Sequence, residues 1–338
     1  MKAILARITA RHNLSEREAS DAFDLIMEGQ ATPAQLGAFL AAMKLKGETV
    51  EELTGAALSM RRHAIFVDSR GLPVLDTCGT GGDSSGTFNI STAAAMIAAG
   101  AGVPVAKHGN RSVTSLCGSA DVLERLGVNL ETQPEVMEET LAETGLAFLF
   151  APKLHLAMKH AIGPRRELGF RTLFNLLGPL TNPAGAKAQV LGVFSPELTE
   201  IFAEVLRRLG SRHVLVVHGL DGMDELTTVT RSRVSELKEG RIRTYELDPL
   251  PLVGAYASPG ELAGGDPEVN AGILRRILNG EPGPQREIAC LNAAAGLVAA
   301  DQAAGFAEGL ELARRSIDTG KARAVLTALI VKTGSTGG

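Results

Sequence analysis

Hydrophobic residues in the first 65 positions recur at helical spacing, and no strand pattern interrupts them. Three helix starts punctuate this segment: capping boxes at Ser15–Glu18 and Thr49–Glu52, and a proline at the first helical position in Thr32–Pro33. The apolar positions between them recur at helical spacing, and they are Leu25, Ile26, Leu36, Phe39, Leu40, Met43, Leu53 and Leu58. The pattern predicts a small helical bundle.

From Leu72 onward the pattern changes to short apolar runs, each followed by a glycine-rich turn and a helical stretch. The runs predict strands at 73–77, 103–106, 146–150, 188–193 and 213–219, and a hairpin that turns at Glu239–Gly240. The helical stretches are 91–101, 119–126, 134–144, 196–209 and 284–300. Alternating strands and helices indicate an α/β fold with a mostly parallel sheet flanked by helices.

A basic, helical segment near residues 158–183 breaks this alternation, and we expect it to rejoin the N-terminal bundle. The predicted organisation is therefore a small discontinuous helical domain and a larger α/β domain. The helical domain takes residues 1–70, joined by 158–185, and the α/β domain takes residues 71–157 and 186–338.

Composition narrows the function classes. The chain has 338 residues, of which 45% are hydrophobic and 21% charged, as in ordinary soluble proteins. A net charge of −4 gives no general attraction to nucleic acid or to an anionic membrane. Charged residues interrupt the N-terminus, so we expect no signal peptide, and the longest uncharged run is a poor membrane span. Three cysteines far apart indicate reduced thiols, so we expect a cytoplasmic protein.

The stretch "DTCGTGGDSSGTFNIST", residues 76–92, has the layout of an anion site between a strand and a helix. Glycines let backbone N–H groups approach a phosphate, and the positive end of the helix dipole adds attraction. The stretch lacks the lysine of a Walker A loop and the third glycine of a dinucleotide fingerprint. A plain tight turn is the alternative, but Asp83, Ser91 and Thr92 suit sugar hydroxyls and a hard cation.

Three further clusters follow later strands or the basic segment. "KHGNRSVTS" begins at Lys107 and places cations where the loops of neighbouring parallel strands meet. "DGMDE", residues 221–225, offers the carboxylates of Asp221, Asp224 and Glu225, which Mg²⁺ prefers when it bridges a protein to phosphate. Arg165 and Arg166 offer guanidinium groups for a small acidic co-substrate. A solvated surface is an equal alternative for the acidic loop and for the two arginines, whereas the position of "KHGNR" at the carboxyl end of a strand makes a plain surface turn the weaker alternative there. Together the loops indicate a phosphorylated sugar bound with Mg²⁺.

Taken in order, these segments resemble the anthranilate phosphoribosyltransferase family. The residues that carry the resemblance are "GTGGD", "NIST", "KHGNRS", "GSADVLERLG", "RELGFRTLFNLLGPLTNP" and "DGMDE". The resemblance covers essentially the whole chain, and Leu156 is a modest departure where the family often has proline.

The resemblance implies a fold of the nucleoside phosphorylase/phosphoribosyltransferase type. It also implies transfer of phosphoribose from 5-phosphoribosyl 1-pyrophosphate to the amine of anthranilate, a step of tryptophan biosynthesis that yields N-(5-phosphoribosyl)anthranilate and pyrophosphate. Mg²⁺ is the implied cofactor, and the implied assembly is a homodimer joined through the helical domain.

Site residues carry over from the family motif to matching positions. For phosphoribosyl pyrophosphate they are Gly79, Gly82, Asp83, Thr87, Asn89, Ile90, Ser91, Thr92, Lys107, His108, Gly109, Asn110, Arg111, Ser112, Val113, Thr114, Ser115 and Ser119. For anthranilate they are Gly79, Asn110 and Arg165, and for Mg²⁺ they are Ser91, Asp224 and Glu225. No catalytic acid or base is assigned; His108 is the nearest candidate, and we expect it to hydrogen-bond to substrate.

Two alternative functions share the fold. A pyrimidine-nucleoside phosphorylase has its Lys-His pair ahead of the glycines, whereas Lys107 and His108 follow them by a whole strand–helix unit. A non-enzymatic nucleic-acid-binding relative would need a basic surface, and this chain is net acidic and keeps "DGMDE".

Overall fold

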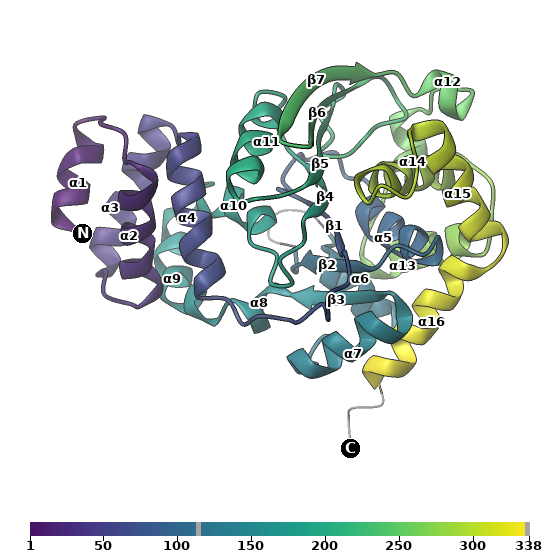
Figure 1. The fold of residues 1–338 in the computed structure, drawn as a ribbon, viewed down its shortest axis with the longest axis horizontal. Coiled ribbons are helices and arrows are strands. Elements are labelled where there is room, and N and C mark those ends of the chain that lie inside the picture. Colours follow the sequence, from purple (N-terminus) through teal and green to yellow (C-terminus); the bar gives the residue numbers. More distant parts are fainter. Residues whose placement is uncertain (113–115, 335–338) are drawn as a thin grey trace.

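The computed structural model describes residues 1–112 and 116–334, so the predictions for Val113, Thr114 and Ser115 lie outside the described residues. A helical bundle lies at one end of the molecule and an α/β unit at the other (Figure 1). Among the described residues, no helix is long and apolar enough to cross a membrane.

The bundle is formed first by α1 (Lys2–Thr9), α2 (Glu16–Met27), α3 (Pro33–Lys46) and α4 (Val50–Arg62). The structure has capping boxes at Ser15, Thr32 and Thr49, so the predicted helix starts are confirmed. A buried ion pair joins Lys46 to Glu52 at 2.8 Å, and Glu52 also accepts the backbone N–H of Leu14 at 2.8 Å. These contacts join the connection between α1 and α2 to the connection between α3 and α4.

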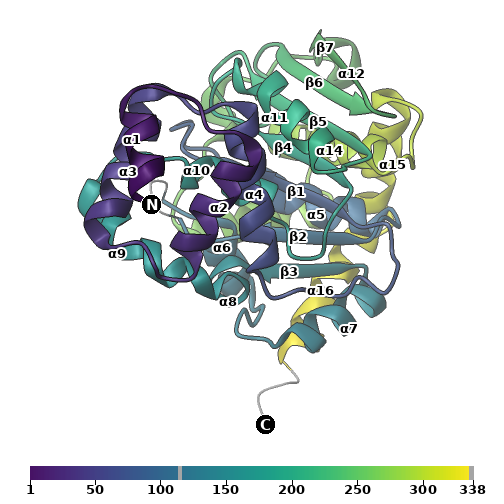
Figure 2. The ribbon, with the colours of Figure 1, turned by 60° about the vertical axis from the view of Figure 1, so that its left-hand side comes forward.

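A later segment of the chain packs against this bundle. It comprises α8 (Ala151–Leu154), η1 (Leu156–Met158), α9 (Lys159–Leu168), α10 (Phe174–Leu177) and η2 (Gly178–Leu180). Helix α9 packs on α3 and α2 (Figures 1 and 2). The ring of Phe174 lies 5.4 Å from that of Phe23. This packing supports a discontinuous helical domain, whose exact boundaries stay a prediction.

The sheet has seven strands in the order β3-β2-β1-β4-β5-β6-β7. The strands are β1 (Leu75–Gly79), β2 (Val105–Gly109), β3 (Leu146–Phe150), β4 (Ala188–Gly192), β5 (His213–Gly219), β6 (Ser232–Lys238) and β7 (Arg241–Leu247). The first five strands are parallel, and β6 and β7 form the predicted antiparallel hairpin. The mostly parallel sheet is therefore confirmed.

Two strands begin two residues later than predicted. The sequence pattern placed their starts at Pro73 and Val103, whereas β1 begins at Leu75 and β2 at Val105. Proline has no N–H to give to a ladder, and Pro73 and Pro104 directly precede this region. At the other end of β1, Cys78 and Gly79 still pair with β4, so this strand extends further than its apolar run.

Helices cover both faces of the sheet (Figure 1). One face packs against α5 (Ile90–Gly100) and α14 (Pro284–Ala299), and the other packs against α11 (Leu198–Arg208) and the bundle. The remaining elements are α6 (Ser119–Leu126), α7 (Pro134–Thr144), α12 (Leu250–Val253), η3 (Pro259–Leu262), α13 (Pro267–Leu278), α15 (Phe306–Asp318) and α16 (Lys321–Gly334). Because β1, β2, β4 and β5 are parallel, the loops after their carboxyl ends meet at one edge of the sheet.

Candidate functional site

The glycine-rich loop leaves β1 and docks on the acidic loop that follows β5. The N–H of Gly81 donates to Oδ2 of Asp224 at 2.9 Å. A Cβ added at Gly79 would lie 2.8 Å from the same oxygen, so a larger residue here would push the Asp224 carboxylate away. Gly81 and Gly82 have φ of +65° and +76°, a region that other residues rarely adopt. The loop therefore presents bare backbone, as an anion site requires.

The first turn of α5 joins the same two loops. The N–H of Ser91 donates to Oε1 of Glu225 at 3.1 Å. Asn89 does not face outward, because its amide donates to the carbonyl of Cys117 and accepts from Asn270. Of the predicted residues here, Ile90 and Thr92 are buried and Thr87 bridges to Ala263. Of the side chains of residues 89–92, only that of Ser91 is therefore neither buried nor engaged with Cys117 and Asn270.

The alternation of β2 sends its two polar side chains to opposite faces of the sheet. The ammonium of Lys107 is buried and donates to the carbonyl of Thr77 in β1, and to Oγ of Ser91 in α5 at 3.2 Å. The imidazole of His108 faces η2, and its Nδ1 lies 3.2 Å from the carbonyl oxygen of Gly178. Strand β2 thereby places one polar side chain on each face of the sheet.

Burial keeps His108 neutral. Burial lowers the pKa of His108 to about 3, and the neighbouring His155 adds to this effect at 5.1 Å between ring centroids. Burial likewise lowers the pKa of His155 to about 4. The Nε2 atoms of both rings are buried without a hydrogen-bond partner among the described residues. A neutral imidazole with so low a pKa is a poor general base near pH 7 but can hydrogen-bond to a ligand.

Helix α6 holds the loop that follows β2. Arg111 donates to Asp121 at 3.1 Å and to Glu124 at 2.8 Å, so two carboxylates of α6 neutralise its charge. Asn110 is exposed; its Oδ1 accepts the N–H of Arg111, and its carbonyl accepts the hydroxyl of Ser119 at 3.3 Å. The N–H of Ser112 donates to Asp121, and a Cβ at Gly109 would overlap Ser119.

Three carboxylates gather beside the glycine-rich loop: Asp83, Asp224 and Glu225. Burial, and after it the charge of Asp83, raises the pKa of Asp224. Burial, and after it the charge of Asp224, raises the pKa of Glu225. Such crowding of negative charge favours a divalent cation. Within residues 1–112 and 116–334, no group of three or more His, Cys, Asp or Glu side chains is arranged to hold a metal ion by itself.

Asp221, the other acid of this loop, has a different place. Its carboxylate accepts the hydroxyl of Thr227 at 2.7 Å and the N–H of Met223 at 3.4 Å. Asp221 therefore stabilises the turn and does not belong to the cluster of Asp83, Asp224 and Glu225.

Arg165 and Arg166 point to different environments. The guanidinium of Arg165 lies over the ring of Phe174, 5.0 Å from its centroid, and burial lowers its pKa. Arg165 forms no salt bridge within the described part of the chain. Arg166 is exposed. Arg165 is thus a half-buried cation that has no carboxylate partner within the described residues.

Sequence reasoning missed two residues that touch the site. Asp76 is fully buried in β1, and its Oδ1 accepts the N–H of His108 at 3.0 Å. An aspartate inside the apolar run "VLDT" was a signal that could have found it. Arg171 donates to the carbonyl of Gly82. Nothing in the basic segment distinguishes Arg171 from its neighbours, so no sequence signal pointed to this contact.

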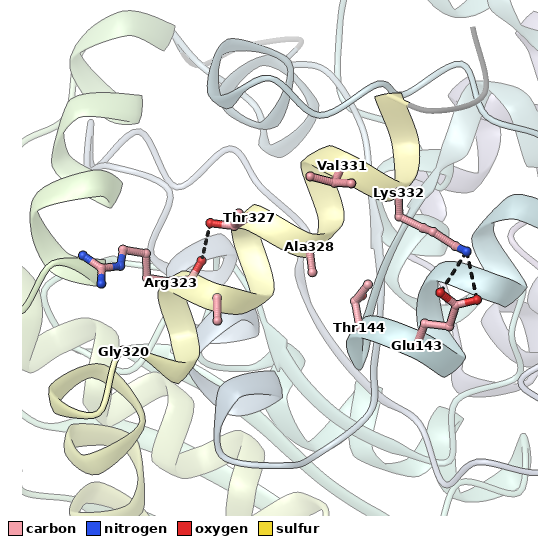
Figure 3. Close-up of a pocket in the computed structure, with 9 residues that line it drawn as sticks. Glu143, Thr144, Gly320, Arg323, Thr327, Ala328, Val331 and Lys332 are labelled. Carbon is pink, nitrogen blue, oxygen red and sulfur yellow. Dashed lines mark hydrogen bonds and ion pairs between the residues drawn. The ribbon is translucent and has the colours of Figure 1, made fainter. Parts of the chain in front are cut away.

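A separate hollow of about 610 Å³ lies between α16 and α7, away from these loops (Figure 3). It is lined by Ala324, Ala328 and Val331, and Lys332 bonds Glu143 at its end. This open groove carries none of the predicted site residues.

Two protein-family profiles match the chain. The profile described as "Glycosyl transferase family, helical bundle domain" covers residues 2–64, and "Glycosyl transferase family, a/b domain" covers residues 71–323.

Individual relatives match along their full lengths. An anthranilate phosphoribosyltransferase of Syntrophobacter fumaroxidans is 55% identical over 326 residues, which are 96% of this chain and 97% of that protein. The crystal structure of anthranilate phosphoribosyltransferase from Thermus thermophilus has a TM-score of 0.93 and 44% identity, covering 98% of this chain and 99% of the other. The Saccharomyces cerevisiae enzyme in complex with PRPP and Mg has a TM-score of 0.89 and 28% identity, covering 99% of both chains. The yeast enzyme is also known in complex with 4-fluoroanthranilate, with a TM-score of 0.87, 27% identity and 99% coverage of both chains.

Proposed function

The chain belongs to the anthranilate phosphoribosyltransferase family, and from that premise we propose which of its residues carry out the reaction. The protein transfers phosphoribose from 5-phosphoribosyl 1-pyrophosphate to the amine of anthranilate, in tryptophan biosynthesis (EC 2.4.2.18). The observation that carries the assignment of residues is the meeting of three loops at one sheet edge, where Gly81 bonds Asp224 and Ser91 bonds Glu225.

The first substrate is held by the glycine-rich loop, the first turn of α5 and the loop after β2. Backbone N–H groups of these loops bind the phosphates, and the start of α5 adds its dipole. Arg111 acts mainly by ordering the loop after β2, because its guanidinium is already bonded to Asp121 and Glu124. Lys107 stabilises the site from its protein side, because its ammonium is bonded to the carbonyl of Thr77 and to Ser91.

Ser91, Asp224 and Glu225 would hold Mg²⁺ when phosphoribosyl pyrophosphate is bound. The residues fit the ion, because Asp224 and Glu225 are crowded, partly buried carboxylates whose pKa values are raised by burial and by neighbouring negative charge. When bound, Mg²⁺ neutralises charge that develops on the departing pyrophosphate. A matching relative, the yeast enzyme, is known with PRPP and Mg.

The second substrate lies on the other face of β2. Arg165 pairs with the carboxylate of anthranilate, and Asn110 and the backbone of Gly79 complete the contacts. The neutral imidazole of His108, whose pKa burial lowers to about 3, hydrogen-bonds to the ligand. The ring of Phe174 keeps the guanidinium of Arg165 in place.

In the reaction, the bond between C1′ of the ribose and the pyrophosphate oxygen breaks, and a bond from C1′ to the anthranilate nitrogen forms. The bonding electrons leave with pyrophosphate, and the proton lost from nitrogen passes to water. The aromatic amine is neutral at pH 7, so no strong base is needed. Alignment of two bound substrates contributes up to about 7–11 kcal/mol in favourable cases, and it supplies much of the rate.

The test is a two-substrate assay with product analysis. Purified protein with both substrates and Mg²⁺ is expected to form N-(5-phosphoribosyl)anthranilate, and a chelator is expected to stop the reaction. Turnover of a nucleoside with inorganic phosphate, but not of anthranilate, would instead favour a nucleoside phosphorylase.

The assembly and the compartment are also part of the proposal. The protein is a homodimer joined through the helical domain, where large apolar side chains are exposed: Leu45 is 80% and Ile162 is 50% exposed. Its three cysteines are free, which suits the cytoplasm. Light scattering tests the dimer: Leu45→Glu is expected to give monomers, whereas Val269→Glu, at an equally apolar exposed position on α13, is not.

A further inference from the structure

The glycine-rich loop needs positive charge nearby to hold a pyrophosphate, and two of the predicted cations are engaged elsewhere. Arg111 is bonded to Asp121 and Glu124. Lys107 is buried and bonded to Thr77 and Ser91. Within the described residues, neither makes a recorded hydrogen bond to residues 79–83.

Arg171 does contact this loop. Its guanidinium donates to the carbonyl of Gly82, and its guanidinium carbon lies 4.8 Å from the centroid of the Phe194 ring. Phe194 follows β4 closely, and its N–H donates to Oγ1 of Thr80 at 3.2 Å. The flat guanidinium on a fixed ring has a set orientation, so Arg171 reaches the loop in a defined way.

Gly82 is shaped to receive this contact. Its φ is +76°, and a Cβ at this position would overlap the guanidinium of Arg171. A side chain at residue 82 would therefore displace the guanidinium of Arg171 from this position.

The contact fixes the orientation of the next peptide group. In a trans peptide the C=O and the following N–H point in opposite directions, and the described chain has no cis peptide bond. When Arg171 holds the carbonyl of Gly82, the N–H of Asp83 must point to the opposite side. In the described part of the chain, no hydrogen bond from the Asp83 N–H is recorded.

Arg171 also belongs to the segment that carries the other substrate contact. It lies between α9 and α10, two residues after Gly169, whose φ of +65° ends α9. Arg165 lies on α9 itself. A single short stretch of chain therefore connects the glycine-rich loop to the proposed anthranilate contact.

We propose that Arg171 is a positioning residue for phosphoribosyl pyrophosphate: by holding the Gly82 carbonyl, it directs the Asp83 N–H to the phosphate. This inference rests on the proposed function, since it takes the glycine-rich loop as the phosphate site. Arg171 acts through Gly82, and its charge at the rim of the loop adds attraction for the anion.

Calorimetric titration with phosphoribosyl pyrophosphate and Mg²⁺ tests the proposal. Arg171→Ala is expected to raise the dissociation constant by about tenfold or more, because a charged hydrogen bond is lost. Arg171→Lys is expected to lie between, since lysine donates but does not stack as a planar group. Added methylguanidine is expected to restore part of the affinity of Arg171→Ala, which a purely structural role would not allow. Arg166→Ala is the matched control and is expected to bind normally, because Arg166 is exposed on α9.

An unchanged dissociation constant in Arg171→Ala would overturn the proposal, as would an equal loss of affinity for anthranilate. If Arg171→Ala does not fold, Arg171→Lys and Phe194→Leu carry the test. Phe194→Leu removes the ring under the guanidinium and is expected to weaken binding by about two- to fivefold; normal binding in both variants would overturn the proposal. Titration needs no acceptor, so wild-type protein that binds this substrate but transfers nothing would contradict the proposed function alone.

Discussion

Replacing Arg165 with alanine separates the two substrates. The guanidinium is half-buried over Phe174, and no carboxylate pairs with it among the described residues. A carboxylate that enters this partly dry place needs a charged partner, and such a hydrogen bond contributes about 1.5–3 kcal/mol. Each 1.4 kcal/mol is a factor of ten, so the Michaelis constant for anthranilate is expected to rise by about 10- to 150-fold.

The assay is steady-state kinetics with each substrate varied in turn, on variants whose melting temperature is checked. The Michaelis constant for phosphoribosyl pyrophosphate is expected to stay unchanged, because its loops are built from other residues. Loss of the contact with the Phe174 ring is expected to cost stability of only about 0.5–1 kcal/mol. Arg166→Ala, which alters an exposed neighbour, is the control. The reasoning is refuted if Arg165→Ala weakens both substrates equally, or if Arg166→Ala has the larger effect.

Three other predictions concern the phosphate loop, the metal and the buried histidines. Gly82→Val is expected to abolish calorimetric binding of phosphoribosyl pyrophosphate in a folded protein, whereas Gly86→Val, with a similar φ of +67° but no atom near its Cβ, is expected to retain it; normal binding by Gly82→Val would make the loop a mere turn. Asp224→Asn combined with Glu225→Gln is expected to remove most activity without unfolding, and full activity at ordinary Mg²⁺ concentration would exclude these residues as ligands. Between pH 6.5 and about 4, the unfolded chain protonates His155 while the folded protein does not, so unfolding free energy falls on acidification by up to about 1.4 kcal/mol per pH unit. His155→Gln is expected to flatten that part of a melting-temperature profile, and an unchanged slope would contradict the burial argument.

The elements of the fold were largely predictable because their signals are local. Capping residues such as Ser15 and Thr49 mark helix starts within four positions, and apolar runs mark strands. The errors at Pro73 and Val103 arose where backbone hydrogen bonding, rather than hydrophobicity, decides the strand boundary. The packing of α9 on α3 depends on contacts between distant residues, and only the break in alternation signalled it.

The candidate site was predictable as a set of loops but not as a set of contacts. Parallel strands bring their following loops together, so the meeting of Gly81 with Asp224 follows from topology. The partner of each charged side chain does not follow from topology. Arg111 pairs with Glu124, Asp221 pairs with Thr227, and Lys107 donates to the carbonyl of Thr77. These pairings depend on side-chain directions in three dimensions, which spacing along the chain does not contain.

Transfer of phosphoribose to anthranilate is best checked by the release of pyrophosphate from phosphoribosyl pyrophosphate, measured with Mg²⁺ in the presence and absence of anthranilate. The expected result is release that depends on anthranilate and matches its consumption mole for mole. Release that is the same without anthranilate, or no release with both substrates and Mg²⁺ present, would contradict the proposed reaction.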